Sequence, residues 1–150
     1  MLVTIIKFIH ILAAIVAVGM NISYGVWIIR AQRDPSHTAF ALKGIKFIDD
    51  RIANPAYGVL LVTGLLMVFL IGYKITTLWI AVALVLFVAL IVVAATQYTP
   101  TLRNQVKLAE AGDTTSPEFS RLAKRGQTLG QALGVIVVLI LAMMVFKPTL

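Results

Sequence analysis

The stretch from Ala56 to Tyr98, AYGVLLVTGLLMVFLIGYKITTLWIAVALVLFVALIVVAATQY, decides the fold class of this chain. Its only charged residue is Lys74, which divides it into uncharged runs at 56–73 and 75–98. Each run has about the twenty residues that a helix needs to cross the hydrocarbon core of a bilayer. Polar and apolar residues do not alternate along the runs, and backbone groups in lipid must be satisfied within their own segment, so we expect helices rather than strands. The stretch therefore predicts an antiparallel pair of transmembrane helices joined by a very short turn.

Two more apolar runs lie on either side of this pair. One extends from Phe8 to Ile29, directly after Lys7, and the other from Gly126 to Phe146. The run after Lys7 is too long for the core of a signal peptide and no small-residue cleavage site follows it, so we expect it to remain as a mature helix. The sequence thus predicts a single all-α membrane domain over residues 1–150, a four-transmembrane-helix bundle with spans at about 3–29, 56–73, 75–98 and 126–146.

The composition agrees with a membrane protein and excludes several classes of site. Hydrophobic residues make up 60% of the 150 residues and charged residues only 13%, whereas about a quarter of a soluble domain is charged. The net charge of +7 comes mostly from the polar connectors, so it indicates membrane orientation and not nucleic-acid binding. The absence of cysteine excludes disulfides, thiolate metal sites and cysteine nucleophiles.

The basic residues also predict the orientation. Three lysines, Lys7, Lys74 and Lys147, belong to one side of the bundle, and the other ten basic residues belong to the connectors on the opposite side. The positive-inside rule then places the connectors in the cytoplasm and both termini outside, in the cytoplasmic membrane. All six acidic residues share the connector side, which is therefore rich in charges of both signs.

The connector between the first two spans is expected to contain a helix of its own. Apolar residues recur at helical spacing from Phe40 to Ile52, with charged residues off that stripe. This pattern predicts a short amphipathic helix that lies at the inner membrane interface. Asn54-Pro55 is then expected to act as the N-cap and first position of the second span.

The connector before the last span carries the same kind of signal. Ser116-Pro117 predicts a helix start, and a helix from there to Phe146 would have thirty residues and a length of about 45 Å. We therefore expect the fourth helix to project into the cytoplasm. The third helix is expected to continue past Pro100 with a kink, and Gly112-Asp113 marks the turn between the two helices.

Three glycines at every fourth position form the sharpest local pattern, Gly126, Gly130 and Gly134 in GQTLGQALG. Small residues at this spacing let helix backbones approach closely in lipid. The ladder predicts a helix contact, either within the chain or with another chain. On the first helix, Gly19 and Ser23 form a matching small pair.

Polar side chains flank this glycine ladder and suggest a bridge to the first helix. Gln127 and Gln131 could form a hydrogen bond with Asn21 or Ser23, which lie at similar depth. Asn21 and Ser23 are two residues apart and point to different sides of the helix, so one contact face cannot use both. We interpret these residues as packing contacts rather than as catalytic groups.

His10 is the one residue well inside a span that titrates near neutral pH, and such a residue is a functional hypothesis by default. Three interpretations stay open: a hydrogen bond to a neighbouring helix, a haem or metal ligand, and a contact with a proton or substrate. A haem would need a second axial ligand, for which a methionine of the outer half, Met67 above all, is a candidate. The alternative is that these methionines fill gaps in the packing.

The connectors offer weaker candidates for chemistry. His37 lies in a loop, and Asp49-Asp50-Arg51 is interpreted as a solvated helix face with local ion pairing. No serine–histidine–acid set, glycine-rich phosphate loop or metal-spaced carboxylate cluster occurs in the sequence. Hydrolytic or nucleotide chemistry of the soluble type is therefore not expected.

Several short motifs carry a resemblance to a known family. KFIHILAAIVAVG at 7–19, DRIANP at 50–55, Thr63-Gly64 and the polar loop before the last span are similar to an uncharacterised bacterial family of integral membrane proteins, domain of unknown function 2269. The resemblance implies a four-helix protein of the bacterial inner membrane and no assigned activity. The opening is also similar to copper-resistance membrane domains and to haem-containing protoporphyrinogen oxidases, which implies a ligand role for His10 alone.

These observations favour a non-enzymatic membrane protein that acts as a subunit or scaffold. Its expected partners are the lipid bilayer and either further copies of the chain or another membrane protein. One alternative is a redox protein that binds haem b through His10, and another is a small-solute transporter.

Overall fold

The computed structural model of the chain describes residues 1–148, which form four long helical rods and no strand. Each rod is long and apolar enough to cross a membrane. The all-α, four-helix fold class is therefore confirmed. In chain order, the elements are α1 (Leu2–Arg33), η1 (Pro35–His37), α2 (Thr38–Ile48), η2 (Asp49–Ala53), α3 (Asn54–Ile71), α4 (Leu78–Val93), η3 (Ala94–Tyr98), α5 (Thr99–Glu110) and α6 (Pro117–Phe146).

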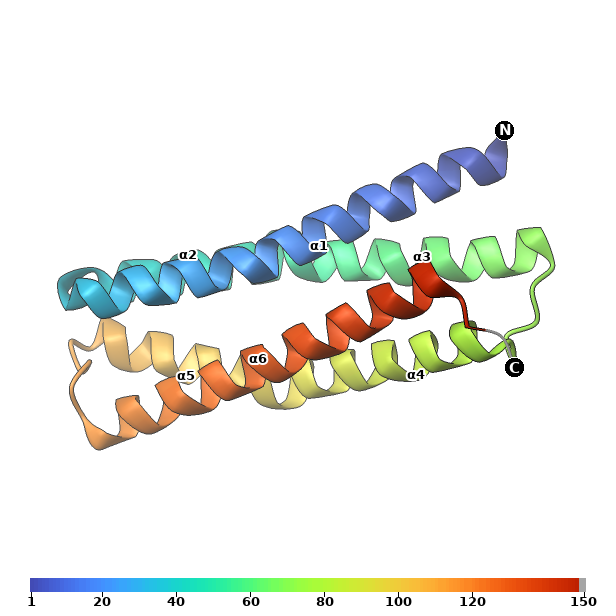
Figure 1. Cartoon of the computed structure of the whole chain (residues 1–150). Coiled ribbons are helices and arrows are strands. Elements are labelled where there is room, and N and C mark those ends of the chain that lie inside the picture. The colour runs from blue at the N-terminus through green and yellow to red at the C-terminus, as the bar shows by residue number, and fades with distance from the viewer. Residues whose placement is uncertain (149–150) are drawn as a thin grey trace.

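The rods pair into two hairpins that lie one above the other (Figure 1). In the first hairpin α1 packs along α3, and in the second α4 packs along α6. The two hairpins are joined mainly where α2 meets α5, while α1 and α6 approach each other only briefly. The start of α1, the end of α6 and the 72–77 turn lie at one end, which we call the terminal end; the polar connectors form the other, the connector end.

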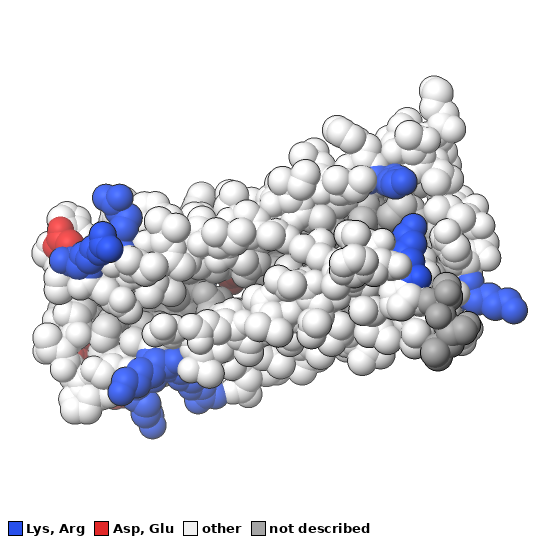
Figure 2. Space-filling view, in the orientation of Figure 1, with Lys and Arg blue, Asp and Glu red and all other residues white. Residues whose placement is uncertain are grey.

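The outward faces of the rods are apolar. In the most apolar window of each rod only 11–22% of the residues are buried, and large side chains such as Ile15, Val85 and Val138 are exposed. Charged residues gather at the two ends, and the face seen in Figure 2 is otherwise uncharged except for acidic surface inside a recess. Such a surface is compatible with lipid and not with water.

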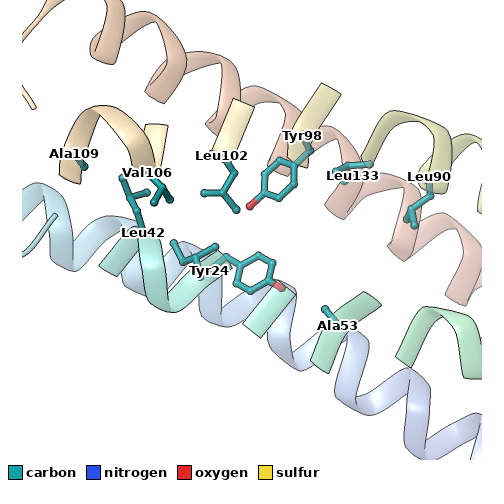
Figure 3. Close-up of a cluster of buried hydrophobic side chains, with 10 residues drawn as sticks. Tyr24, Leu42, Ala53, Leu90, Tyr98, Leu102, Val106, Ala109 and Leu133 are labelled. Atoms are coloured by element: carbon teal, nitrogen blue, oxygen red, sulfur yellow. The ribbon is translucent and has the colours of Figure 1, made fainter. Parts of the chain in front are cut away.

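A helix, α2, occupies the first connector, but it is not a separate element. α2 continues through η2 into α3 as one rod, and the Ala53 backbone is right-handed helical (φ −68°, ψ −48°). The prediction that Asn54 caps a new helix is therefore wrong. The reason is tertiary packing: Leu42 and Ile45 of α2 are buried in the connector-end core with Leu102 and Val106 of α5 (Figure 3).

Two π-helical segments interrupt the middle rods, and each ends two residues before a proline. η2 precedes Pro55, and η3 precedes Pro100. Proline lacks a donor and its ring clashes with the carbonyl four residues earlier. We attribute the wider π turns to this clash, because they let the helix continue through the proline. α5 accordingly extends past Pro100, as the sequence predicted.

The start of α6 agrees with the sequence in detail. Ser116 is the N-cap, and its hydroxyl accepts a hydrogen bond from the backbone N–H of Phe119 at 3.1 Å. Pro117 is the first helical residue, and the helix runs for 30 residues to Phe146. The preceding turn passes through Gly112, whose φ of +80° suits glycine.

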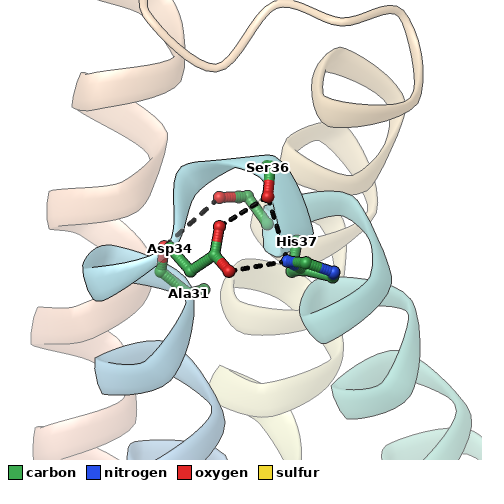
Figure 4. Close-up of polar contacts among 5 residues, drawn as sticks. Ala31, Asp34, Ser36 and His37 are labelled. Carbon is green, nitrogen blue, oxygen red and sulfur yellow. Dashed lines mark hydrogen bonds and ion pairs between the residues drawn. The ribbon is translucent and has the colours of Figure 1, made fainter.

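Local hydrogen bonds and aromatic contacts close both ends of the bundle. The α1–α2 turn is held by Ser36 and His37, which both hydrogen-bond to the Asp34 carboxylate (Figure 4). At the terminal end, the rings of Tyr73 and Trp79 meet edge to face with centroids 5.6 Å apart. Aromatic rings of this kind prefer the depth of a membrane interface.

Candidate functional site

A cavity of about 370 Å³ lies between the two hairpins, toward the connector end. Figure 2 shows a recess on the side of the molecule, between the layers of Figure 1, with acidic surface inside it. The cavity wall is formed by α1, η2, α3, α4, η3 and α6 and is unusually polar for a bundle of apolar helices. Its polar lining residues are Asn21, Tyr24, Gln32, Asp49, Asn54, Tyr57, Tyr98, Gln127 and Gln131.

Helical spacing explains why these residues meet. Asn21, Tyr24, Gly25, Ile28 and Gln32 are three or four residues apart and share one face of α1. On α6, four of the five lining residues form two adjacent pairs one turn apart, each pair a glycine followed by a glutamine, and Leu133 is the fifth. Because glycine has no side chain, it leaves space where another residue would fill the gap between the helices.

Asp49 is the most unusual residue in this cavity. Its side chain is buried, with 8% of the residue exposed, and it is the one charged residue of the lining. Tyr24 donates its hydroxyl hydrogen to Oδ1 at 3.2 Å, and the Asn54 amide nitrogen lies 3.5 Å from Oδ2. Within residues 1–148 no basic side chain lies within 4.0 Å of it, since Lys46 pairs with Asp50 instead. A buried carboxylate without a cationic partner is costly.

A second polar pair lies deeper along α1. The Asn21 amide nitrogen donates to the Tyr57 hydroxyl oxygen at 2.6 Å and to the carbonyl oxygen of Ala17 at 2.8 Å. The amide oxygen of Asn21 and the hydroxyl hydrogen of Tyr57 remain available. The cavity therefore presents both acceptors and donors to a ligand.

The two π-helical segments both face the cavity. η2 contributes Asp49, and η3 contributes Ala94 and Tyr98. Figure 3 shows the Tyr98 ring facing the Tyr24 ring across the gap between the hairpins. Single π turns occur frequently at functional sites. The cavity thus combines buried charge, convergent polar groups and irregular backbone.

The sequence interpretation of Asp49-Asp50-Arg51 is correct for two residues and wrong for the first. Asp50 and Arg51 are exposed, and Asp50 pairs with Lys46 as expected. Asp49 is buried. The signal that could have revealed this is its position seven residues after Leu42 and four after Ile45, on the buried stripe of α2.

The predicted glycine contacts are distributed over more than one place. A Cβ on Gly126 would lie 3.2 Å from Gln105 Oε1 of α5, and one on Gly130 would lie 3.9 Å from the Tyr98 ring. A Cβ added to Gly134, or to Gly19 of α1, would have no neighbouring atom within 4 Å. The ladder therefore packs against its own hairpin at its first two glycines.

The expected polar bridge between α1 and α6 takes a different form. Asn21, Gln127 and Gln131 line the same cavity. Among the described residues no hydrogen bond joins either glutamine to α1. The Asn21 amide nitrogen donates to Tyr57 and Ala17, and the Ser23 hydroxyl donates to the carbonyl oxygen of Met20. These side chains surround a space instead of closing it.

His10 forms a separate contact in the half of the bundle nearer the terminal end. Its Nδ1 lies 2.8 Å from the Thr63 hydroxyl oxygen, and that hydroxyl donates its one hydrogen to the carbonyl oxygen of Val59 at 2.6 Å. With the hydroxyl hydrogen on Val59, Nδ1 carries a hydrogen and donates to Thr63, which leaves Nε2 with a lone pair. The hydrogen bond to a neighbouring helix, one of the three interpretations of His10, is present.

The ring of His10 packs against α3, the helix that carries Met67, its candidate partner for a haem. A Cβ on Gly64 would lie 3.2 Å from His10 Cε1, so the Nδ1–Cε1 edge of the ring rests on α3, the helix that carries Met67. Within the part of the chain described by the structure, no three His, Cys, Asp or Glu residues could hold a metal ion.

Comparison with known proteins gives one match. A family described as predicted integral membrane protein, DUF2269, matches residues 4–148. No curated protein and no solved structure matches the chain. The matched region covers all four helical rods, and the resemblance first noted in the short motifs is confirmed. The chain therefore belongs to the DUF2269 family of integral membrane proteins.

Proposed function

We propose that this protein is a non-enzymatic, membrane-embedded binding protein that holds a small polar ligand in the cavity between its hairpins. The observation that carries the proposal is Asp49, a buried carboxyl group without a basic partner at the wall of a 370 Å³ cavity. Pockets for small molecules have volumes of about 300–1,000 Å³ and a few convergent polar groups. An ionisable residue inside a membrane bundle marks a functional site by default.

The proposed setting is the bacterial inner membrane, with the connector end in the cytoplasm and both termini outside. The support is the positive-inside rule, because ten of the thirteen basic residues belong to the connector end. In this orientation the cavity lies in the inner half of the membrane and opens between α1 and α6.

Binding is a better interpretation than transport. The polar lining of the cavity ends at Asn21 and Gln131, and the core nearer the terminal end is an apolar cluster of Val68, Trp79 and Ile80. A polar solute would have to pass this apolar layer to leave at the terminal end. The cavity groups, one carboxyl with amides and phenols, are suited to orienting a ligand.

Native mass spectrometry and thermal unfolding of the purified protein test the proposal. The wild-type protein should retain a small molecule or be stabilised by members of a library of polar metabolites, and Asp49→Asn should weaken this. Asp50→Asn is the matched control, because it removes an exposed carboxyl one residue away. If Asp49→Asn behaves as the wild type does with every compound, the cavity is not a binding site.

A second candidate function, a subunit of a membrane complex, is favoured by the free face of α1. The N-terminal part of α1 leaves the bundle in Figure 1, and Gly19 has open space beside it. A second copy or a partner helix could pack there. Gly19→Leu should then remove a partner or a dimer seen after gentle extraction, while Gly44→Leu, at an equally open glycine of the connector end, should not.

A further inference from the structure

We infer that the ligand of this cavity carries an ammonium group. The inference rests on the proposed function, since it names the ligand class of the same site. Its first basis is charge: Asp49 is the one formally charged residue among those that line the cavity, and no lysine, arginine or histidine lines it. A cationic ligand would supply the partner that the carboxylate lacks.

The unused atoms of Asp49 and of the two asparagines nearby are hydrogen-bond acceptors, which suits a ligand group that donates. The carboxylate accepts two long contacts, at 3.2 and 3.5 Å, and has further lone pairs. Asn21 and Asn54 both direct their amide nitrogens toward protein acceptors, which leaves their amide oxygens unused. An ammonium group has three donors and no acceptor, so it complements this set.

Aromatic rings strengthen the preference for a cation. Tyr24, Tyr57 and Tyr98 all line the cavity. The face of an aromatic ring attracts an ammonium ion, by about 0.5–2 kcal/mol according to its exposure to water. An anion would be repelled by the carboxylate and by the negative faces of these rings.

The size of the cavity argues for an organic cation and against a bare metal ion. A cavity of 370 Å³ is far larger than one water molecule, which occupies about 30 Å³. Divalent metal ions need about six oxygen ligands at short distance, whereas Asp49 is the one carboxyl group in the lining. A small primary amine fits both the volume and the charge.

The amine could come from solution or from a lipid headgroup, because the recess opens on the side of the bundle (Figure 2). Both sources share a primary ammonium group beside an oxygen atom. Free ethanolamine represents the first source and phosphatidylethanolamine the second. The experiment therefore has one arm for each.

The first arm compares three small probes that differ in charge, namely ethanolamine, ethylene glycol and glycolate, by calorimetry and thermal unfolding in an uncharged detergent. Ethanolamine should bind the wild-type protein at least about tenfold more tightly than the other two. Asp49→Asn should remove this preference, and Asp50→Asn should keep it. The comparison of probes on the wild-type protein does not depend on any variant folding.

The second arm compares nanodiscs of phosphatidylethanolamine with nanodiscs of phosphatidylglycerol. A lipid ligand would raise the unfolding temperature of the wild-type protein in phosphatidylethanolamine alone, and Asp49→Asn would remove the difference. A preference for the ammonium probe or for the ammonium lipid supports the inference.

The outcomes separate the two proposals. If ethylene glycol or glycolate binds as tightly as ethanolamine, and the lipids do not differ, the ammonium assignment is wrong while the cavity remains a binding site. If no probe, lipid or metabolite distinguishes the wild type from Asp49→Asn, both proposals fail.

Discussion

Tyr24 and Asp49 join the two rods of the first hairpin through a buried hydrogen bond, with the phenolic oxygen 3.2 Å from the carboxylate Oδ1. Both side chains are buried, and neither has a basic neighbour within ion-pair distance in the described chain. This bond holds the carboxyl group at the cavity wall. It is therefore the contact on which the properties of the site depend most directly.

Replacing Tyr24 by phenylalanine should destabilise the protein. The change removes a donor from a buried carboxyl group and leaves the packing of the ring intact, at a cost of about 1–3 kcal/mol. Thermal unfolding in detergent measures the effect. Tyr73→Phe is the control, because the Tyr73 hydroxyl is exposed at the terminal end, and equal unfolding temperatures for the two variants would contradict the role of this bond.

Leucine at Gly130 should also lower the stability, whereas leucine at Gly134 should have little effect. A Cβ at Gly130 would already be 3.9 Å from the Tyr98 ring, so a longer side chain would force that ring to move. Overpacking of this kind lowers the free energy of unfolding by about 1–3 kcal/mol. No atom lies within 4 Å of a Cβ at Gly134. The measurement is the denaturation midpoint of both variants, and a larger loss at Gly134 would show that the ladder contacts another chain there.

The tautomer of His10 is expected to be the one with hydrogen on Nδ1. The Thr63 hydroxyl oxygen lies 2.6 Å from the Val59 carbonyl oxygen, and with its hydrogen directed there the Thr63 oxygen accepts from His10. Nitrogen-15 chemical shifts of the ring should report a protonated Nδ1 and an unprotonated Nε2. Thr63→Val should shift the Nδ1 signal and Thr76→Val should not; the opposite tautomer in the wild type would mean that the Thr63 hydroxyl donates to His10.

Asp34 should titrate below the ordinary range of an aspartate. Hydrogen bonds from Ser36 and from His37, the latter at 2.8 Å, lower the pKa of the Asp34 carboxyl group in the folded protein (Figure 4). The stabilisation is therefore complete above the pKa of the unfolded chain and is lost as the pH falls through the lower folded value.

Carbon-13 shifts of the Asp34 carboxyl group measure this titration. Ser36→Ala should raise the pKa of Asp34 toward that of a free aspartate, because it removes the largest cause of the shift. Ser120→Ala, at an exposed serine of α6, should leave the titration curve unchanged. A curve for Asp34 that does not respond to Ser36→Ala would show that the turn does not hold the carboxylate.

The features that the sequence predicted well are those with local causes. Four apolar runs of about twenty residues require four helices in lipid, whatever surrounds them. Ser116 caps α6 by accepting a hydrogen bond from the backbone N–H of Phe119, only three residues away. The chain turns at Gly112 because glycine can adopt a positive φ. Each of these depends on neighbours in the chain.

The features that only the tertiary structure decided are those that depend on which rods meet. Asp49 resembles a solvated residue of the connector until α2 is seen to stand beside α1 and α5 and to turn this carboxylate toward Tyr24. Asn54-Pro55 resembles a helix start until the π turn of η2 carries the rod through the proline. The cavity itself exists because two hairpins that each pack closely within themselves meet over only part of their length. Lipid determines that each rod is a helix, and only packing between rods determines which polar groups remain buried together.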